Sequence, residues 1–132
     1  MNENDFIRSN EASQRQMRVQ EILRAALSEI LFRGESKNYI LDENIITITH
    51  VDVSPDLRRA KFLFIPSDAK QIDKFTDAFN SAKKVIRKKI AEKVQLKYVP
   101  EISFHFDESI DEIEKLDKIF SSEKVKNDTR IK

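Results

Sequence analysis

The sequence predicts an α+β fold, in which helices pack on one face of a small three-stranded sheet. Three patterns indicate it. A long segment after Ser13 repeats apolar residues at helical spacing. Apolar and polar residues alternate over 45–65 on both sides of a turn, and they alternate again over 101–106, after a second helical region. Helices are not interposed regularly between the strands, which favours helices segregated on one face of a sheet. A length of 132 residues suits one domain.

The first helix begins after Ser13, which forms an S-x-x-Q capping box with Gln16. Gly34 lies just past its expected end, where a left-handed residue is favoured. The apolar face of this helix comprises Val19, Ile22, Leu23, Ala26, Leu27, Ile30 and Leu31.

Residues 45–53 and 59–65 are predicted to pair as a hairpin, because both are rich in β-branched or aromatic residues. The S-P-D-L sequence at 54–57 predicts the turn, since Pro55 fixes φ. Pro66 should end the second strand.

A β-bulge is predicted near Thr49–His50 in the first strand. The parity of the apolar residues changes at this point, and one extra residue would return all of them to the same face. These apolar residues are Ile46, Ile48, Val51 and Val53.

The next helical region begins at Ser67 or Asp68, either of which can cap it. Polar residues around 80–84 interrupt its apolar phase, which predicts two helices meeting at an angle, or one kinked helix, with the break near Ser81–Lys84. The apolar residues before the break are Ile72, Phe75, Phe79 and Ala82, and those after it are Ile86, Ile90 and Val94.

Residues 101–106 form the third predicted strand, with Ile102, Phe104 and Phe106 facing the core. A second capping box, from Ser109 to Glu112, predicts a short acidic helix over 109–120. The expected organisation is a flexible tail at 1–12, one domain over 13–120, and a disordered tail at 121–132.

Composition excludes several classes of site. There is no cysteine, hence no disulfide and no thiolate chemistry. One glycine cannot build a P-loop, a dinucleotide fingerprint or a GxxG nucleic-acid clamp. No apolar run is long enough to span a bilayer, and the first residues lack the apolar core of a signal peptide. We therefore expect a cytoplasmic protein with no cofactor, no metal, no small-molecule substrate and no membrane partner.

The most informative segment is 83–100, a predicted amphipathic helix with the residues that follow it, in which residues 83–97 carry a net charge of +6. Residues 101–117 carry −6. This separation predicts a dipolar surface and a binding face for a polyanion, because clustered cations gain affinity by releasing counterions from phosphates. A solvated helix face, or pairing between the two charged segments, is the competing interpretation.

Two smaller basic groups are weaker candidates. Arg58 and Arg59 with Lys61 follow the predicted turn and could reach phosphate, although an ordinary charged edge is as plausible. For Arg15, Arg18 and Arg24 on the first helix, solvation of the helix is favoured. The phenylalanines recur at core spacing, so they are interpreted as packing residues and not as base-stacking platforms.

No catalytic residue is predicted. His50 and His105 lie on strands without the spacing of a metal site, and no serine is marked as a nucleophile. The acids at 107–112 lack the pattern of a calcium loop and suit a helix start. A small hydrolase using either histidine is kept as a minor alternative. Another alternative is a protein-interaction module that docks through the acidic helix at 109–120.

Three blocks of sequence resemble bacterial ribosome-binding factor A: RQMRVQEILRAALSEIL, ITITHVDVSPDLRRAKFLFI and IRKKIAEKVQLKYVPEISFHFDESI. The resemblance covers roughly residues 13–120. It implies a KH-like domain of type II topology that binds the free small (30S) ribosomal subunit and its 16S rRNA. It also implies a role in late subunit maturation and 5′-end rRNA processing, most important in the cold, without enzymatic activity. A monomer is expected.

The family has an interrupted A-x-G kink in place of GxxG. The matching positions here are Ala82, Lys83 and Lys84, so a lysine replaces the family glycine and the kink angle is in question. The candidate RNA-binding residues are Lys83, Lys84, Arg87, Lys88 and Lys89, followed by Arg58, Arg59, Lys93 and Lys97. Binding is expected to use phosphate contacts and shape, with little direct base readout.

Overall fold

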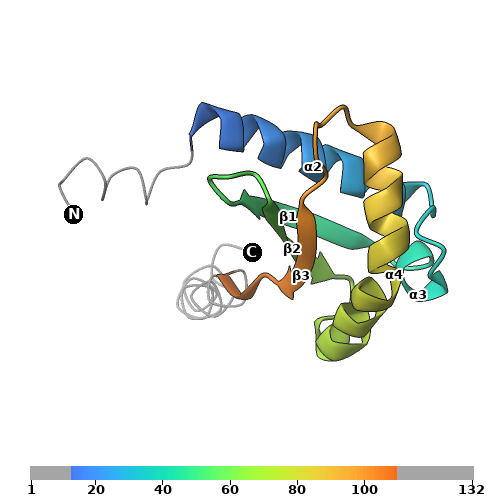
Figure 1. The fold of residues 1–132 in the computed structure, drawn as a ribbon. Helices are drawn as coiled ribbons and strands as arrows, with labels where there is room; N and C mark the ends of the chain where they lie inside the picture. Colours follow the sequence, from blue (N-terminus) through green and yellow to red (C-terminus); the bar gives the residue numbers. More distant parts are fainter. Residues whose placement is uncertain (1–12, 110–132) are drawn as a thin grey trace, which may run out of the picture.

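The computed structural model describes residues 13–109. The tails expected at 1–12 and 121–132, and the acidic helix beyond Ser109, lie outside the described residues, so the bounds of the 13–120 domain stay a prediction. The elements, drawn in Figure 1, are α2 (Gln14–Phe32), α3 (Tyr39–Asp42), β1 (Ile46–Val53), β2 (Arg59–Pro66), the 3-10 helix η1 (Ala69–Gln71), α4 (Ile72–Lys93) and β3 (Glu101–Phe106).

Helix α2 begins and ends as predicted. The Ser13 hydroxyl accepts from the Gln16 amide at 3.1 Å, and the Ser13 amide donates to the Gln16 side chain at 2.9 Å. Gly34 has a φ of 65°, and the amides of Gly34 and Glu35 donate to carbonyls of the last helical turn. This is a Schellman ending, which requires the left-handed residue. Ile22, expected on the buried face, is 37% exposed because it lies at the edge of that face.

The sheet has the order β1-β2-β3. Strands β1 and β2 pair antiparallel, and the register shifts between Ile48 and His50. The extra residue is Thr49, which confirms the predicted bulge. Strand β3 pairs with β2 in parallel, from Arg59 opposite Glu101 to Phe64 opposite Phe106. The two edges of the sheet are therefore β1 and β3.

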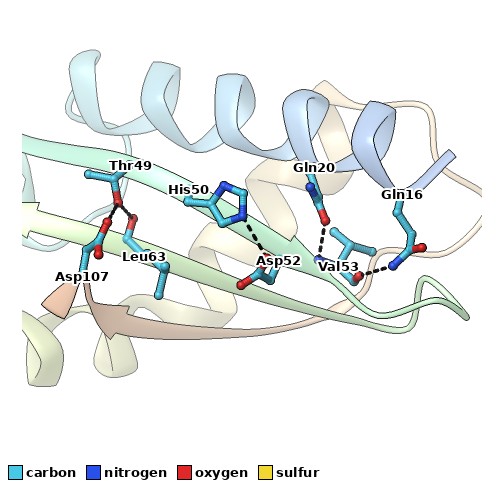
Figure 2. A network of polar contacts seen from close by, with 8 residues as sticks. All are labelled: Gln16, Gln20, Thr49, His50, Asp52, Val53, Leu63 and Asp107. Carbon is cyan, nitrogen blue, oxygen red and sulfur yellow. Dashed lines mark hydrogen bonds and ion pairs between the residues drawn. The ribbon is translucent and has the colours of Figure 1, made fainter. Parts of the chain in front are cut away.

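The bulge is closed by Asp107, the residue that follows β3 (Figure 2). The Thr49 hydroxyl donates to the Asp107 carboxylate at 2.6 Å and approaches the Leu63 carbonyl at 3.3 Å. Asp107 is 7% exposed and also accepts from the Ser109 hydroxyl at 2.5 Å. Burial raises the pKa of Asp107, but hydrogen bonds from Ser109 and Thr49 together outweigh burial, so the pKa lies below its ordinary value.

We expect acid to remove the contribution of Asp107 to stability. Because the folded pKa is depressed, the ionised carboxylate stabilises the fold above its unfolded pKa of about 3.9, and this gain disappears as pH falls through the folded value. At pH 7, Asp107→Asn should cost about 1–3 kcal/mol, since Asn offers one acceptor oxygen and an unmatched donor. Urea unfolding at about pH 7 and about pH 3 measures the free energy of unfolding of both proteins. The difference between wild type and variant should be smaller at the lower pH. An equal difference at both pH values would contradict this account.

The core lies between the sheet and two helices on one of its faces. Helix α2 packs on β1, α4 packs on β3, and the two helices contact each other (Figure 1). Phe79 of α4 stacks on Phe104 of β3 with ring centroids 4.6 Å apart, and lies 4.8 Å from Phe64 of β2. Within residues 13–109, the phenylalanines are thus packing residues, with the exception of Phe32, which is 92% exposed.

Two forms were predicted for the interruption near Ser81–Lys84: two helices meeting at an angle, or one kinked helix. Helix α4 is helical throughout Ile72–Lys93, although Figure 1 shows its first and later turns running in different directions. The kinked single helix is therefore the form observed. Ala82 is buried, three residues after Phe79 and four before Ile86, so the apolar face continues through the polar cluster. Lys84 is also a better helix former than the glycine it replaces.

Helix α3 was not predicted, because four residues carry no periodicity. Its start is fixed by the Asn38 side chain, which accepts from the amides of Ile40 and Leu41. Leu41 is fully buried and joins this turn to the core. Over residues 13–109, no helix has the length and apolar character needed to cross a membrane.

Candidate nucleic-acid interface

The linker between α4 and β3 presents two exposed residues between half-buried ones. Leu96 and Val99 pack against the core. Lys97 is exposed, and Tyr98 is 74% exposed. The packing of Leu96 and Val99 therefore leaves Lys97 and Tyr98, which lie between them, on the outside of the molecule.

Arg87 of α4 holds this linker. Its guanidinium donates to the Val99 carbonyl at 2.9 Å and to the Pro100 carbonyl at 3.2 Å. Pro100 is fully buried. Arg87 is therefore a positioning residue for Tyr98 as well as a cation.

The predicted cations of α4 gather beside this linker. Lys84, Arg87 and Lys88 line a hollow of ≈ 610 Å³ whose other wall includes Lys97 and Tyr98. They recur at i, i+3 and i+4, which places them on one side of the helix. The structure thus brings together four of the predicted residues: Lys84, Arg87, Lys88 and Lys97.

The β1–β2 turn and the first turn of α2 each add a cation beside Tyr98. Arg58 and Arg15 line a second hollow, of ≈ 380 Å³, which also includes Lys97 and Tyr98. Arg58 emerges from a turn in which the Ser54 carbonyl accepts from the Leu57 amide at 2.8 Å. We call the surface formed by these residues the Tyr98 surface: Arg15, Arg58, Lys84, Arg87, Lys88, Lys97 and Tyr98.

The Asp56 carboxylate, two residues before Arg58, forms its hydrogen bonds within the turn. Asp56 accepts from the Ser54 hydroxyl at 2.6 Å and from the Arg58 amide at 3.1 Å. These hydrogen bonds, led by the one from Ser54, lower the pKa of Asp56. Leu57 has a φ of 61°, a conformation rarely adopted by a branched residue, and it packs against the core. The turn is thus held by its own contacts.

No cation of the Tyr98 surface forms an ion pair with another residue in the part of the chain that the structure describes. Positive charge concentrated in this way attracts a polyanion.

Lys93 does not belong to the surface. Its ammonium lies 3.4 Å from Glu29 and 3.3 Å from Glu35, and its side chain is 21% exposed. It joins the end of α4 to the end of α2 and the residues after it. Lys93 is therefore left out of the Tyr98 surface, because its charge is already matched by two carboxylates, and its role in RNA binding stays a prediction.

Three other predicted residues lie away from the hollows. Lys83 and Lys89 are half-buried on α4, and Arg59 is exposed at the start of β2. The charge of Lys83 contributes to lowering the pKa of His105, behind burial and Lys61, which places it near β3. Charge counting could not separate these three residues from the cations that line the hollows.

Two residues of the surface were missed by sequence reasoning. Arg15 was assigned to helix solvation, and Tyr98 was not singled out. A signal for Tyr98 existed, since it follows a cation in a linker whose apolar residues alternate with polar ones.

The histidines have separate partners on exposed strand positions. His50 lies 2.8 Å from Asp52 (Figure 2), and His105 lies 3.0 Å from Ser103. Neither histidine lines a hollow of the Tyr98 surface. Asp107, one of the acids considered as a cation site, closes the bulge. Over residues 13–109, no group of three or more possible metal ligands occurs.

The chain is similar to ribosome-binding factor A in sequence and in structure. The family model "Ribosome-binding factor A" matches residues 15–120. Ribosome-binding factor A of Methylobacterium sp. (strain 4-46) is 37% identical over 116 residues, which cover 88% of this chain and 84% of that protein.

Two solved structures share the fold. The crystal structure of ribosome-binding factor A from Thermus thermophilus has a TM-score of 0.57 at 17% identity, covering 68% of this chain and 93% of that one. A homology model of the T. thermophilus protein, fitted into the cryo-EM map of a 30S complex, has a TM-score of 0.53 at 17% identity, covering 66% of this chain and 89% of that one. The predicted KH-like fold is confirmed by these neighbours together with the observed order of elements. The chain therefore belongs to the ribosome-binding factor A family.

Proposed function

We propose that this protein binds the free small ribosomal subunit by contacting the phosphate backbone of 16S rRNA through the Tyr98 surface. The observation that carries the proposal is the gathering of cations from α2, the β1–β2 turn, α4 and the linker around one exposed side chain. Membership of the family supports it, as does the 30S complex of the T. thermophilus protein.

In this proposal the protein supports late maturation of the subunit and processing at the 5′ end of the rRNA. It acts in the cytoplasm as a monomer, by binding and not by catalysis. Lys84, Lys88, Lys97 and Arg58 would contact phosphates. Arg87 would contribute charge while it holds the linker. Contacts of this kind fix orientation without reading sequence.

The response to salt tests this mode of binding. If about five phosphates are neutralised, log affinity should fall with log salt at a slope of about −4, so that a rise from about 50 to about 200 mM weakens binding about 200-fold. The measurement is co-sedimentation of the full chain with purified small subunits over a salt series, with assembled ribosomes in parallel. We expect binding to free subunits and weaker binding to assembled ribosomes. A flat salt response would favour a protein–protein contact and would contradict the phosphate mode.

A further inference from the structure

Tyr98 stands between three hollows of the surface. Besides the two described above, it lines a third, of ≈ 380 Å³, with Arg58, Arg87, Val99 and Glu101. Its ring is 74% exposed, whereas Phe62, Phe64, Phe75 and Phe79 are at most 2% exposed. The ring thus offers an apolar surface at the point where the cations converge.

The backbone that carries the ring is held in position before any ligand arrives. Arg87 binds the two carbonyls that follow Tyr98, and Pro100 is fully buried. Leu96, two residues before Tyr98, packs against the core. A side chain on an anchored backbone loses little conformational entropy on binding, so stacking there is favoured over stacking on a loose loop.

Charge lies on both sides of the ring. Lys97 is closest, with its ammonium 5.7 Å from the ring centroid. Arg58 lies toward the β1–β2 turn, and Lys84 and Lys88 lie toward α4. This arrangement fits a ligand with a flat group in the middle and an anion at each end.

The geometry points to an unpaired RNA nucleotide as that ligand. Its base stacks on Tyr98, the phosphates before and after it contact Arg58 in one hollow and Lys84 and Lys88 in the other, and Lys97 lines both hollows. A duplex keeps its bases stacked inside and cannot supply the flat group. An acidic peptide would match the cations but would not need the ring. This inference rests on the proposed function, because it names the RNA element that the Tyr98 surface takes.

The first test compares affinities for two probes, a ten-nucleotide oligoadenylate and an RNA duplex of the same length. Tyr98→Ala in the full chain should weaken oligoadenylate binding about 5- to 150-fold, which is the loss expected when one stacked base is released. Tyr98→Phe should bind as wild type does, and duplex binding should be unchanged in both variants. Tyr39→Ala is the matched control, since Tyr39 is 72% exposed on α3 and outside this surface.

The second test uses tyrosine fluorescence. The chain has no tryptophan and two tyrosines, so Tyr39→Phe leaves Tyr98 as the one emitting side chain. Oligoadenylate should quench this emission by stacking. Inorganic polyphosphate, which offers anions without bases, should bind the same cations and leave the emission nearly unchanged.

Unchanged affinity of Tyr98→Ala for oligoadenylate, or quenching as strong with polyphosphate, would overturn the stacking inference. Salt-dependent binding to subunits would then still support the proposed function. If the wild-type chain binds neither oligoadenylate nor small subunits, both proposals fail. Competition by poly-glutamate that requires Tyr98 as strongly as RNA does would also overturn the nucleotide assignment.

Discussion

The double variant Lys84→Glu/Lys88→Glu should bind the small ribosomal subunit about 30- to 100-fold more weakly than wild type at about 0.1 M salt. Each phosphate contact accounts for nearly one decade of affinity under these conditions, and two are removed. The salt slope should become shallower by about 2. Both side chains are exposed and outside any described ion pair, so the fold should be unaffected. Arg87 is left in place, because reversing its charge would release the linker as well as remove a cation.

The matched control is Lys70→Glu/Lys74→Glu. It has the same spacing and the same change in net charge, and both lysines are exposed at the opposite end of the helical segment. We expect a small loss of affinity from the change in overall charge. Equal losses in the two variants, with both proteins folded by circular dichroism, would show that net charge and not the Tyr98 surface governs binding.

Phe79→Ala should destabilise the fold by about 3–5 kcal/mol, the usual cost of removing a buried phenylalanine side chain. Phe79 is fully buried and contacts rings of two strands, at 4.6 Å from Phe104 and 4.8 Å from Phe64. It therefore joins α4 to both β2 and β3. Domains of this size are commonly stable by about 5–15 kcal/mol, so the variant should unfold at a much lower urea concentration.

Phe32→Ala is the control for this prediction. It deletes the same atoms from a side chain that is 92% exposed, so its effect should stay within about 0.5 kcal/mol. Urea unfolding followed by far-UV circular dichroism measures both variants. If Phe79→Ala lowers the free energy of unfolding no more than Phe32→Ala does, the aromatic cluster does not hold α4 on the sheet.

Local patterns in the sequence predicted the parts of the fold that short-range physics decides. The change of parity between Ile48 and Val51 located the bulge at Thr49, because a strand has a period of two. The capping box at Ser13 and the left-handed residue at Gly34 located the two ends of α2. The polar residues at 80–84 left two forms of α4 open, and a single kinked helix is formed because Ala82 keeps the buried face continuous.

Long-range contacts decided what the sequence could not show. Lys93 looked like its neighbours in a basic segment, but its partners, Glu29 and Glu35, lie far earlier in the chain. Arg15 and Arg58 meet the linker only because β3 pairs in parallel with β2. The composition of the sequence showed that the site is basic. Tertiary packing decides which of the cations lie on the Tyr98 surface.

The parallel pairing of β2 with β3 has a consequence for the order of folding. Arg59 lies opposite Glu101, about forty residues later in the chain, whereas β1 and β2 form a local hairpin. Contacts across such a separation close a long loop and form slowly. During synthesis the hairpin and α2 are complete before β3 exists, and Tyr98 takes its place only when β3 docks. A nascent or truncated chain therefore has the cations of α2 and of the turn but not the assembled Tyr98 surface, so the proposed binding to the small subunit would require a chain that has finished folding.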